Sequence, residues 1–303
     1  MEKVLVTGAT GYIALHCVQQ LLDKGYAVNG SIRSPERKNE IIDALKNSNT
    51  STENLNLFTF NLTSDDGWDA GMEGCDYVLH VASPLALENH TEDYFVKPAV
   101  EGAMRALKFA KKHNVKKVVL TSSVAAIFET GIEKVDYDEN DWSDPDNPKI
   151  SNYAKSKTLA EKAAWDFLDQ EDNPFEFAVI NPALVIGPSL SGDLGVSNFA
   201  IEMVVTGKMP VAIPLQFGFV DVRDVATAHI LAMENTESNG ERFALAESDL
   251  WYRDIANLLR KNGFDKAPTF SVPVWLAKIL AVFNKELKVT VPYLGRVRSV
   301  VKA

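Results

Sequence analysis

Cysteine, histidine and long apolar runs are scarce in this sequence of 303 residues. The two cysteines, Cys17 and Cys75, lie in apolar segments without the spacing of a disulfide framework or a zinc site, which predicts buried free thiols in a reducing cytoplasm. The five histidines also lack metal-ligand spacing, so no metal site is predicted. The longest apolar run near the C-terminus, residues 272–283, is too short to span a bilayer, and no signal peptide is predicted before the first strand. We therefore expect a cytoplasmic protein without a membrane partner.

Positive charge is also in deficit. The chain carries 31 lysines and arginines against 41 aspartates and glutamates, a net charge of −10 at pH 7. This balance argues against nucleic acid as a partner, because nucleic-acid-binding surfaces are basic. The hydrophobic content of 46% and the charged content of 24% are those of an ordinary globular protein with an ample core.

A strand, a glycine turn and a helix are predicted at the start of the chain. Residues 4–6 form a short apolar run typical of a buried strand, and Gly8 and Gly11 mark a tight turn. Apolar residues at helical spacing follow over residues 13–22. The spacing Gly8-x-x-Gly11-x-x-Ala14 favours an anionic ligand held by backbone N–H groups at the helix N-terminus. The alternative is a turn whose small residues serve packing alone.

Strands and helices alternate along the following part of the chain. We predict strands at residues 26–32, 55–60, 77–82, 117–121 and 175–181 and helices at residues 94–113 and 153–170. This alternation predicts an α/β fold of the Rossmann type, a doubly wound parallel sheet with helices on both faces. We expect residues 1–185 to form this domain, with residues 219–235 returning to it, and residues 186–218 and 236–303 to form a small substrate-binding lobe.

The carboxyl ends of the predicted strands are expected to line one crevice, because ligands of such sheets bind at that edge. The residues at these ends are Thr7, Arg33, Asn61, Ala82, Ser123 and Pro182.

Three cations lie close together after the second predicted strand, namely Arg33, Arg37 and Lys38. In a dinucleotide-binding fold this strand end faces the adenosine ribose, where an acidic residue binds the 2′-hydroxyl and an arginine accommodates a 2′-phosphate. The position of Arg33 therefore favours NADP over NAD. A solvated helix start is the alternative, and it fits Lys38 better than Arg33.

Ser123, Tyr153 and Lys157 are the candidate catalytic residues. Tyr153 and Lys157 are four residues apart on a predicted helix, so their side chains share a face. A nearby ammonium favours the phenolate, and the tuned phenol can give a proton to a carbonyl oxygen as hydride arrives. Ser123 can hydrogen-bond the same oxygen. Taken singly, a surface aromatic, a solvated lysine and an N-cap serine would explain the three residues, and their order relative to the glycine turn favours catalysis.

These residues carry a resemblance to a known family. The sequence resembles the extended short-chain dehydrogenases/reductases over roughly residues 3–270. The matching segments are Thr7–Ala14, Leu120–Ser123, Tyr153–Lys157 and Asn181–Ala183. It is similar to the dihydroflavonol reductase-like and methylglyoxal-type NADPH-dependent aldehyde reductases in Ser31–Ser34, His80–Pro84, Ala160–Trp165 and Phe219–Ala226.

The resemblance implies an NADPH-dependent reductase that converts an aldehyde or ketone into an alcohol, as a monomer or homodimer. It implies that Tyr153 is the acid, that Lys157 binds the ribose and tunes the tyrosine, and that Ser123 contacts the carbonyl oxygen. The NADP(H)-binding residues that we expect are Gly8, Thr10, Gly11, Tyr12, Ile13, Arg33, Arg37, Leu62, Ala82, Ser83, Thr121, Tyr153, Lys157, Pro182 and Val185.

Two positions depart from the family pattern. Ala99 stands where many members carry an asparagine, so a relay of four residues is not supported. Phe128 replaces an asparagine that grips flavonoids in plant members, and with Leu85 it predicts an apolar substrate pocket. The alternatives left open are a nucleotide-sugar epimerase or dehydratase with the same three residues, and a non-catalytic NADP-binding protein. Relatives usually continue beyond a segment like residues 289–303, which leaves a truncated chain and a short lobe as two interpretations.

Overall fold

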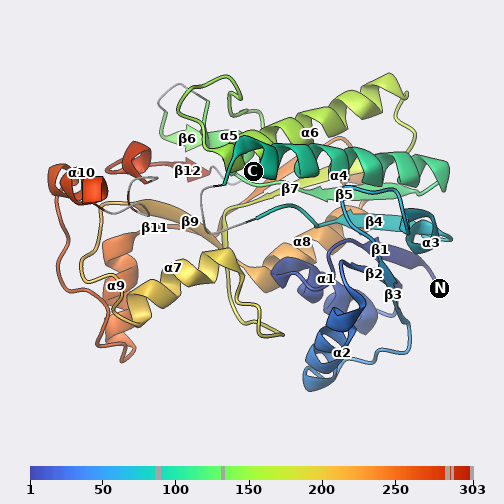
Figure 1. Cartoon of the computed structure of the whole chain (residues 1–303), viewed down its shortest axis with the longest axis horizontal. Helices are drawn as coiled ribbons and strands as arrows, with labels where there is room; N and C mark the ends of the chain where they lie inside the picture. The colour runs from blue at the N-terminus through green and yellow to red at the C-terminus, as the bar shows by residue number, and fades with distance from the viewer. Residues whose placement is uncertain (86–89, 131–133, 284–286, 288–289, 301–303) are drawn as a thin grey trace.

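The structure, a computed structural model, describes residues 1–85, 90–130, 134–283, 287 and 290–300. A parallel sheet of seven strands frames the molecule (Figure 1). In spatial order its strands are β10 (Arg242–Leu245), β7 (Glu176–Pro182), β5 (Lys117–Thr121), β4 (Tyr77–His80), β1 (Lys3–Val6), β2 (Ala27–Ile32) and β3 (Leu55–Thr59). Every neighbouring pair is parallel. The order reverses between β1 and β4, and a ligand crevice opens at such a point.

Helices cover both faces of this sheet. On one face, an apolar core lies between the sheet and the helices α1 (Tyr12–Asp23), α2 (Lys38–Asn47) and α8 (Val222–Glu234). On the other face, a second apolar core lies between the sheet and the helices α3 (Trp68–Met72), α4 (Glu92–Lys112) and α6 (Asn152–Gln170). The alternation of β1 separates the two cores, because Val4 and Val6 enter the first and Leu5 enters the second. The predicted doubly wound Rossmann fold is confirmed.

A second group of elements forms a lobe beside the carboxyl edge of the sheet (Figure 1). Its small sheet holds β8 (Leu184–Ile186), β9 (Gln216–Asp221) and β11 (Ser248–Trp251), and its helices are α7 (Gly195–Val205), α9 (Tyr252–Lys261) and α10 (Val274–Phe283). A separate apolar cluster that includes Val204, Ile213 and Tyr252 stabilises it. Among the described residues, the remaining α-helix is α5 (Ala125–Phe128), and the remaining strands are β6 (Asp136–Tyr137) and β12 (Ser299–Val300), which pair with each other.

The chain returns to the Rossmann domain further than residue 235. Helix α8 packs against β5 and β7, and β10 then pairs in parallel with β7 as the edge strand of the main sheet. Residues 242–245 thus belong to this sheet, although the sequence analysis assigned them to the lobe. The strand has only four residues, all half-buried, so its pattern gave no signal of a buried central strand.

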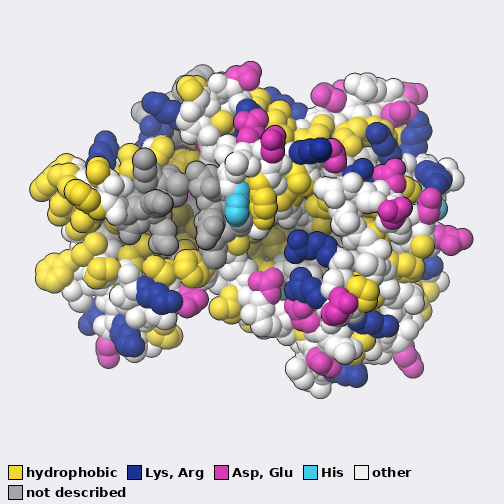
Figure 2. All heavy atoms as spheres, viewed as in Figure 1, with side chains coloured by type: hydrophobic (Ala, Val, Ile, Leu, Met, Phe, Trp, Pro, Cys, Tyr) yellow, Lys and Arg dark blue, Asp and Glu magenta, His cyan; other side chains and the backbone are white. Residues whose placement is uncertain are grey.

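Apolar side chains gather on the surface of the lobe around α10 (Figure 2). Trp275 is 64% exposed and Phe283 is 87% exposed. The helix has 10 residues, which is about half the length needed to cross a bilayer. Among the helices that the structure describes, none combines the length and the apolarity of a membrane span.

Candidate active site

A cleft of about 1300 Å³ runs along the carboxyl edge of the main sheet and under the lobe. Every residue that the sequence analysis assigned to cofactor, catalysis or substrate lines it. They are Gly8, Thr10, Gly11, Tyr12, Ile13, Arg33, Arg37, Leu62, Ala82, Ser83, Leu85, Thr121, Ser123, Phe128, Tyr153, Lys157, Pro182 and Val185.

Of the six strand-end residues expected in the crevice, Thr7 is the exception. It is completely buried, and its hydroxyl lies 3.0 Å from His80 Nδ1 and accepts a hydrogen bond of 3.0 Å from the Ala82 N–H. Thr7 therefore ties β1 to the end of β4, and the expectation that it lines the crevice is corrected.

The glycine turn leaves room for an anionic group at the start of α1. Gly8 has a φ of +68°, and a Cβ on it would lie 3.0 Å from the Cβ of Ala82. Gly11 is the N-cap of α1, where no side chain caps the helix and no acidic residue stands in the first turn. The backbone N–H groups and the positive end of the helix dipole are therefore left for a ligand, as a dinucleotide pyrophosphate requires.

Adding a methyl group at Gly8 tests this cradle. Gly25 offers the matched control, because it also has a positive φ, of +89°, but nothing lies within 4 Å of its Cβ position. We expect Gly8→Ala and Gly25→Ala each to lose about 1 to 2 kcal/mol of unfolding free energy through backbone strain. Only Gly8→Ala should also weaken NADPH binding, by about tenfold or about 1.4 kcal/mol in a fluorescence titration. Equal NADPH affinity in the two variants would contradict the assignment.

The three cations after β2 differ in their surroundings. Arg33 is exposed, lines the cleft and has no carboxylate within 4.0 Å among the described residues. Arg37 also lines the cleft, but its Nη2 lies 2.8 Å from Glu40 Oε1. Lys38 is exposed and outside the lining. Arg33 is thus the guanidinium best placed to meet a phosphate, whereas Arg37 must share its charge with Glu40.

Ser123, Tyr153 and Lys157 come together in the middle of the cleft. Ser123 follows β5, where its hydroxyl accepts a hydrogen bond of 3.1 Å from the Ala125 N–H. Tyr153 and Lys157 share a face of α6, and the Lys157 ammonium lies 6.0 Å from the centroid of the tyrosine ring. The ammonium donates a hydrogen bond of 3.1 Å to the Thr121 carbonyl oxygen. The end of β5 therefore orients both the serine and the lysine.

Burial dominates the electrostatics of this group. It raises the pKa of Tyr153, and the neighbouring Ser123 hydroxyl offsets part of that rise. The sequence analysis expected the lysine to favour the phenolate, but the Lys157 ammonium is bonded to the backbone of β5 instead. Tyr153 is consequently a neutral phenol near pH 7, which is the form that donates a proton. Burial also lowers the pKa of Lys157 to about 8, against the opposing effect of Glu161.

This lysine predicts how NADPH binding depends on pH. Because the pKa of Lys157 is lowered to about 8, its ammonium is charged below that pH and neutral above it. NADPH is an anion, so we expect its dissociation constant to rise as the pH increases through 8, measured by fluorescence between about pH 7 and pH 10. Lys157→Arg keeps a permanent charge and should lose this alkaline limb. If the dissociation constant of Lys157→Arg still rises above pH 8, a group other than Lys157 causes that rise.

Two buried histidines position strand ends that meet the cleft. The Thr121 hydroxyl lies 2.7 Å from His229 Nε2, so Thr121 presents its carbonyl oxygen, rather than its hydroxyl, to Lys157. His80 holds Thr7 in the same way. Burial lowers the pKa of His229 to about 4 and that of His80 to about 3, which keeps both rings neutral. Nothing local in the sequence links these histidines to threonines on distant strands.

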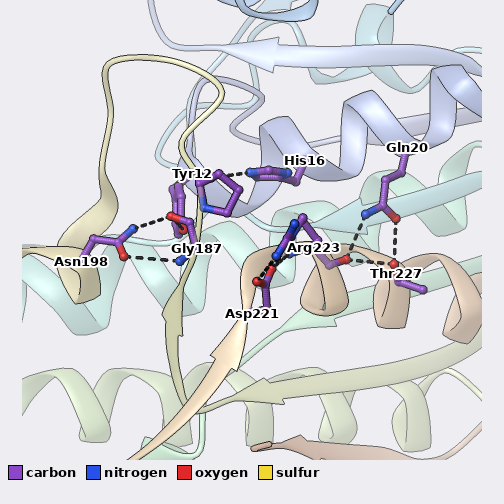
Figure 3. Close-up of polar contacts among 9 residues, drawn as sticks. Tyr12, His16, Gln20, Gly187, Asn198, Asp221, Arg223 and Thr227 are labelled. Atoms are coloured by element: carbon purple, nitrogen blue, oxygen red, sulfur yellow. Dashed lines mark hydrogen bonds and ion pairs between the residues drawn. The ribbon is translucent and has the colours of Figure 1, made fainter. Parts of the chain in front are cut away.

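The loop between β8 and α7 is tied to the start of α1 (Figure 3). The Tyr12 hydroxyl donates a hydrogen bond of 2.8 Å to the Gly187 carbonyl oxygen, and His16 Nε2 lies 3.0 Å from the Pro188 carbonyl oxygen. Asn198 completes the tie through two contacts of 3.4 Å with the backbone of Gly187. Tyr12 therefore lines the cleft and also anchors the lobe over the glycine turn.

Residues from the lobe complete the lining. They include the apolar or aromatic side chains Phe199, Leu215, Phe217 and Tyr293 and polar side chains such as Glu202, Gln216 and Arg298. The sequence analysis missed them, because they lie in irregular or weakly patterned segments that only the folded lobe brings to the cleft.

Comparison with known proteins assigns this architecture to a family. Residues 4–246 match the NAD dependent epimerase/dehydratase family. The chain belongs to that family, within which the predicted extended short-chain dehydrogenases/reductases fall.

Several relatives with similar sequences or structures are reductases. Cinnamoyl-CoA reductase CAD2 of Medicago truncatula is 39% identical over 265 residues, which cover 85% of this chain and 80% of the relative. The yeast methylglyoxal/isovaleraldehyde reductase Gre2 complexed with NADPH has a TM-score of 0.77 at 30% identity, covering 86% of this chain and 82% of that one. Gre2 of Candida albicans in complex with NADPH has a TM-score of 0.79 at 32% identity, covering 89% of this chain and 86% of that one.

Proposed function

We propose that this chain reduces the carbonyl group of an aldehyde or ketone to an alcohol, with NADPH as the hydride donor. The observation that carries the proposal is that Ser123, Tyr153 and Lys157 line the same cleft as the glycine turn and the exposed Arg33. The family and the NADPH complexes of similar structures confirm two predictions, namely an NADPH-dependent reductase and NADP(H) as its cofactor.

Each residue of the site has a proposed role. The glycine turn and the N-terminus of α1 bind the pyrophosphate, and Arg33 binds the 2′-phosphate. The Lys157 ammonium, held by the Thr121 carbonyl oxygen, binds a ribose hydroxyl. The bound cofactor supplies a hydride to the carbonyl carbon. The neutral phenol of Tyr153 donates its proton to the carbonyl oxygen, and the Ser123 hydroxyl stabilises the negative charge that develops there.

The substrate is proposed to be a carbonyl compound with an apolar body. Phe128 and Leu85 line the cleft with the aromatic side chains of the lobe, Phe199 and Phe217. These side chains suit the apolar body of such a substrate. The aldehydes named for the yeast relative, methylglyoxal and isovaleraldehyde, are suitable first probes.

The decisive experiment follows NADPH oxidation with a panel of carbonyl compounds that includes isovaleraldehyde, cinnamaldehyde and an aryl ketone. Wild-type protein should oxidise NADPH with at least one of them and Tyr153→Phe with none. Conversion of a UDP-sugar without net NADPH oxidation would favour the epimerase alternative. Equal rates for wild type and Tyr153→Phe on every compound would favour a non-catalytic NADP-binding protein.

We also propose a cytoplasmic protein that is a monomer or homodimer. Cys17 and Cys75 are buried free thiols, and burial raises the pKa of each thiol to about 12, which suits a reducing compartment. In a homodimer the helices α4 and α6, which pack against each other, would offer the contact face, and light scattering after gel filtration would tell the two states apart.

A further inference from the structure

A buried carboxylate lies one helical turn beyond Lys157 on α6. Glu161 is completely inaccessible to solvent, which is rare for a glutamate unless it is paired. It stands four residues after Lys157, so the two side chains share a face of the helix. Both also line one small cavity of about 10 Å³ between α6 and α4. The Glu161 carboxylate therefore faces the ammonium group of the proposed cofactor site.

Glu161 is connected to the serine of the site as well. Its Oε2 accepts a hydrogen bond of 2.9 Å from Asn181 Nδ2 on β7. The same Asn181 amide donates a hydrogen bond of 3.2 Å to the carbonyl oxygen of Ser123. One carboxylate thus links α6, β7 and the segment that carries Ser123.

Arg242 on β10 holds the other oxygen of this carboxylate. Its Nε lies 2.5 Å from Glu161 Oε1, and the guanidinium carbon lies 3.7 Å from the centroid of the Trp142 ring. A further hydrogen bond of 2.9 Å joins Nη1 to the Asp141 carbonyl oxygen. The arginine is fixed on several sides, so Glu161 has little freedom to leave Asn181.

We propose that Glu161 is a positioning residue of the reductase site, which keeps the Lys157 ammonium charged and, through Asn181, fixes the backbone of Ser123. This inference rests on the proposed function, because it assigns the cofactor and the carbonyl substrate to the same cleft. Glu161 lies within residues 160–165, a segment that is part of the sequence resemblance.

Few charged groups surround Lys157, so the effect of Glu161 on the pKa of Lys157 is measurable. Lys157 faces Tyr153 and Glu161 on its own helix and the neutral His80 on β4. The other surrounding elements contribute uncharged groups. Helix α4 contributes two alanines to the shared cavity, and the four residues of α5 are uncharged. Strands β5 and β7 contribute backbone and amide groups. Glu161 opposes the effect of burial on the pKa of Lys157. Arg242, beside Glu161, is the one further cation linked to this carboxylate among the described residues.

The test measures the dissociation constant of NADPH against pH in the full chain, by fluorescence, together with kcat/KM for the reduction. Glu161→Gln removes a negative charge, which makes the charged form of Lys157 less stable relative to the neutral amine. The alkaline limb, which is the rise of the NADPH dissociation constant as Lys157 loses its proton, should then move to lower pH by about one unit. Arg242→Gln can still donate a hydrogen bond to Glu161 but removes a positive charge, so its limb should move to higher pH. A purely structural ion pair would lower stability in both variants and move neither limb.

Glu176→Gln is the matched control. Glu176 Oε2 lies 3.1 Å from the ammonium of Lys117, a lysine whose side chain is 2% exposed, at the opposite ends of β5 and β7 from the site. This variant removes the carboxylate that pairs with a buried lysine far from the site, so it should keep the wild-type pH profile. A wild-type profile in Glu161→Gln, or shifts of both variants in the same direction, would overturn the proposal. If Glu161→Gln does not fold, the Arg242→Gln variant still tests the proposal. An alkaline limb that stays at the wild-type pH or moves to lower pH in Arg242→Gln would overturn it. Wild-type protein that does not bind NADPH would instead refute the proposed function.

Discussion

Tyr153→Phe is expected to lower the rate of carbonyl reduction by about 10²–10⁴-fold, because it removes the proposed proton donor and leaves the rest of the cleft intact. The ring is half-buried and packs edge-on against Phe95, with centroids 6.3 Å apart, and phenylalanine preserves that contact. NADPH affinity should therefore stay within about twofold, since the hydroxyl acts on the substrate. The measurements are single-turnover reduction at saturating NADPH and a separate NADPH titration.

Tyr94→Phe is the control for this variant. Tyr94 also lines the cleft, is 46% exposed and loses the same hydroxyl, but it lies outside the group of Ser123 and Lys157. Its rate should equal that of wild type. A Tyr153→Phe protein that retains more than about a tenth of the wild-type rate would show that another group or water donates the proton.

Arg33→Ala is expected to change cofactor preference. A charge-assisted hydrogen bond to a phosphate contributes about 1.5 to 3 kcal/mol, so kcat/KM for NADPH should fall by about 10- to 100-fold. Activity with NADH should be unchanged, because NADH lacks the 2′-phosphate that Arg33 would bind. Stability should also be unchanged, since Arg33 has no carboxylate partner among the described residues to lose.

Lys38→Ala supplies the comparison for the loss of one positive charge. Lys38 is exposed and outside the lining of the cleft, so it contributes long-range attraction only. Its effect on NADPH should be less than about twofold at physiological salt. A parallel loss of NADPH and NADH activity in Arg33→Ala would mean that Arg33 supports the fold of the turn rather than the 2′-phosphate.

Much of the fold followed from local patterns. The run of residues 4–6 predicted a buried strand because a parallel strand covered on both faces has no polar side to alternate with. The glycine turn predicted a ligand because its spacing leaves space beside a helix N-terminus. Tyr153 and Lys157 were found as a pair because a separation of four residues on one helix places side chains together. The short strands β9 and β11 escaped this reasoning, since four to six residues that are mostly half-buried carry little periodicity.

The sequence by itself determined six of the seven strands of the nucleotide-binding sheet and the residue types that stand at its carboxyl edge. Only the tertiary structure decided how those residues are charged and held. It turned Thr7 away toward His80 and attached Lys157 to the Thr121 carbonyl oxygen. It also placed Glu161, Asn181 and Arg242 in one buried network. The physical reason is that pKa values and ion pairs depend on burial and on neighbours from distant strands, which no local spacing records.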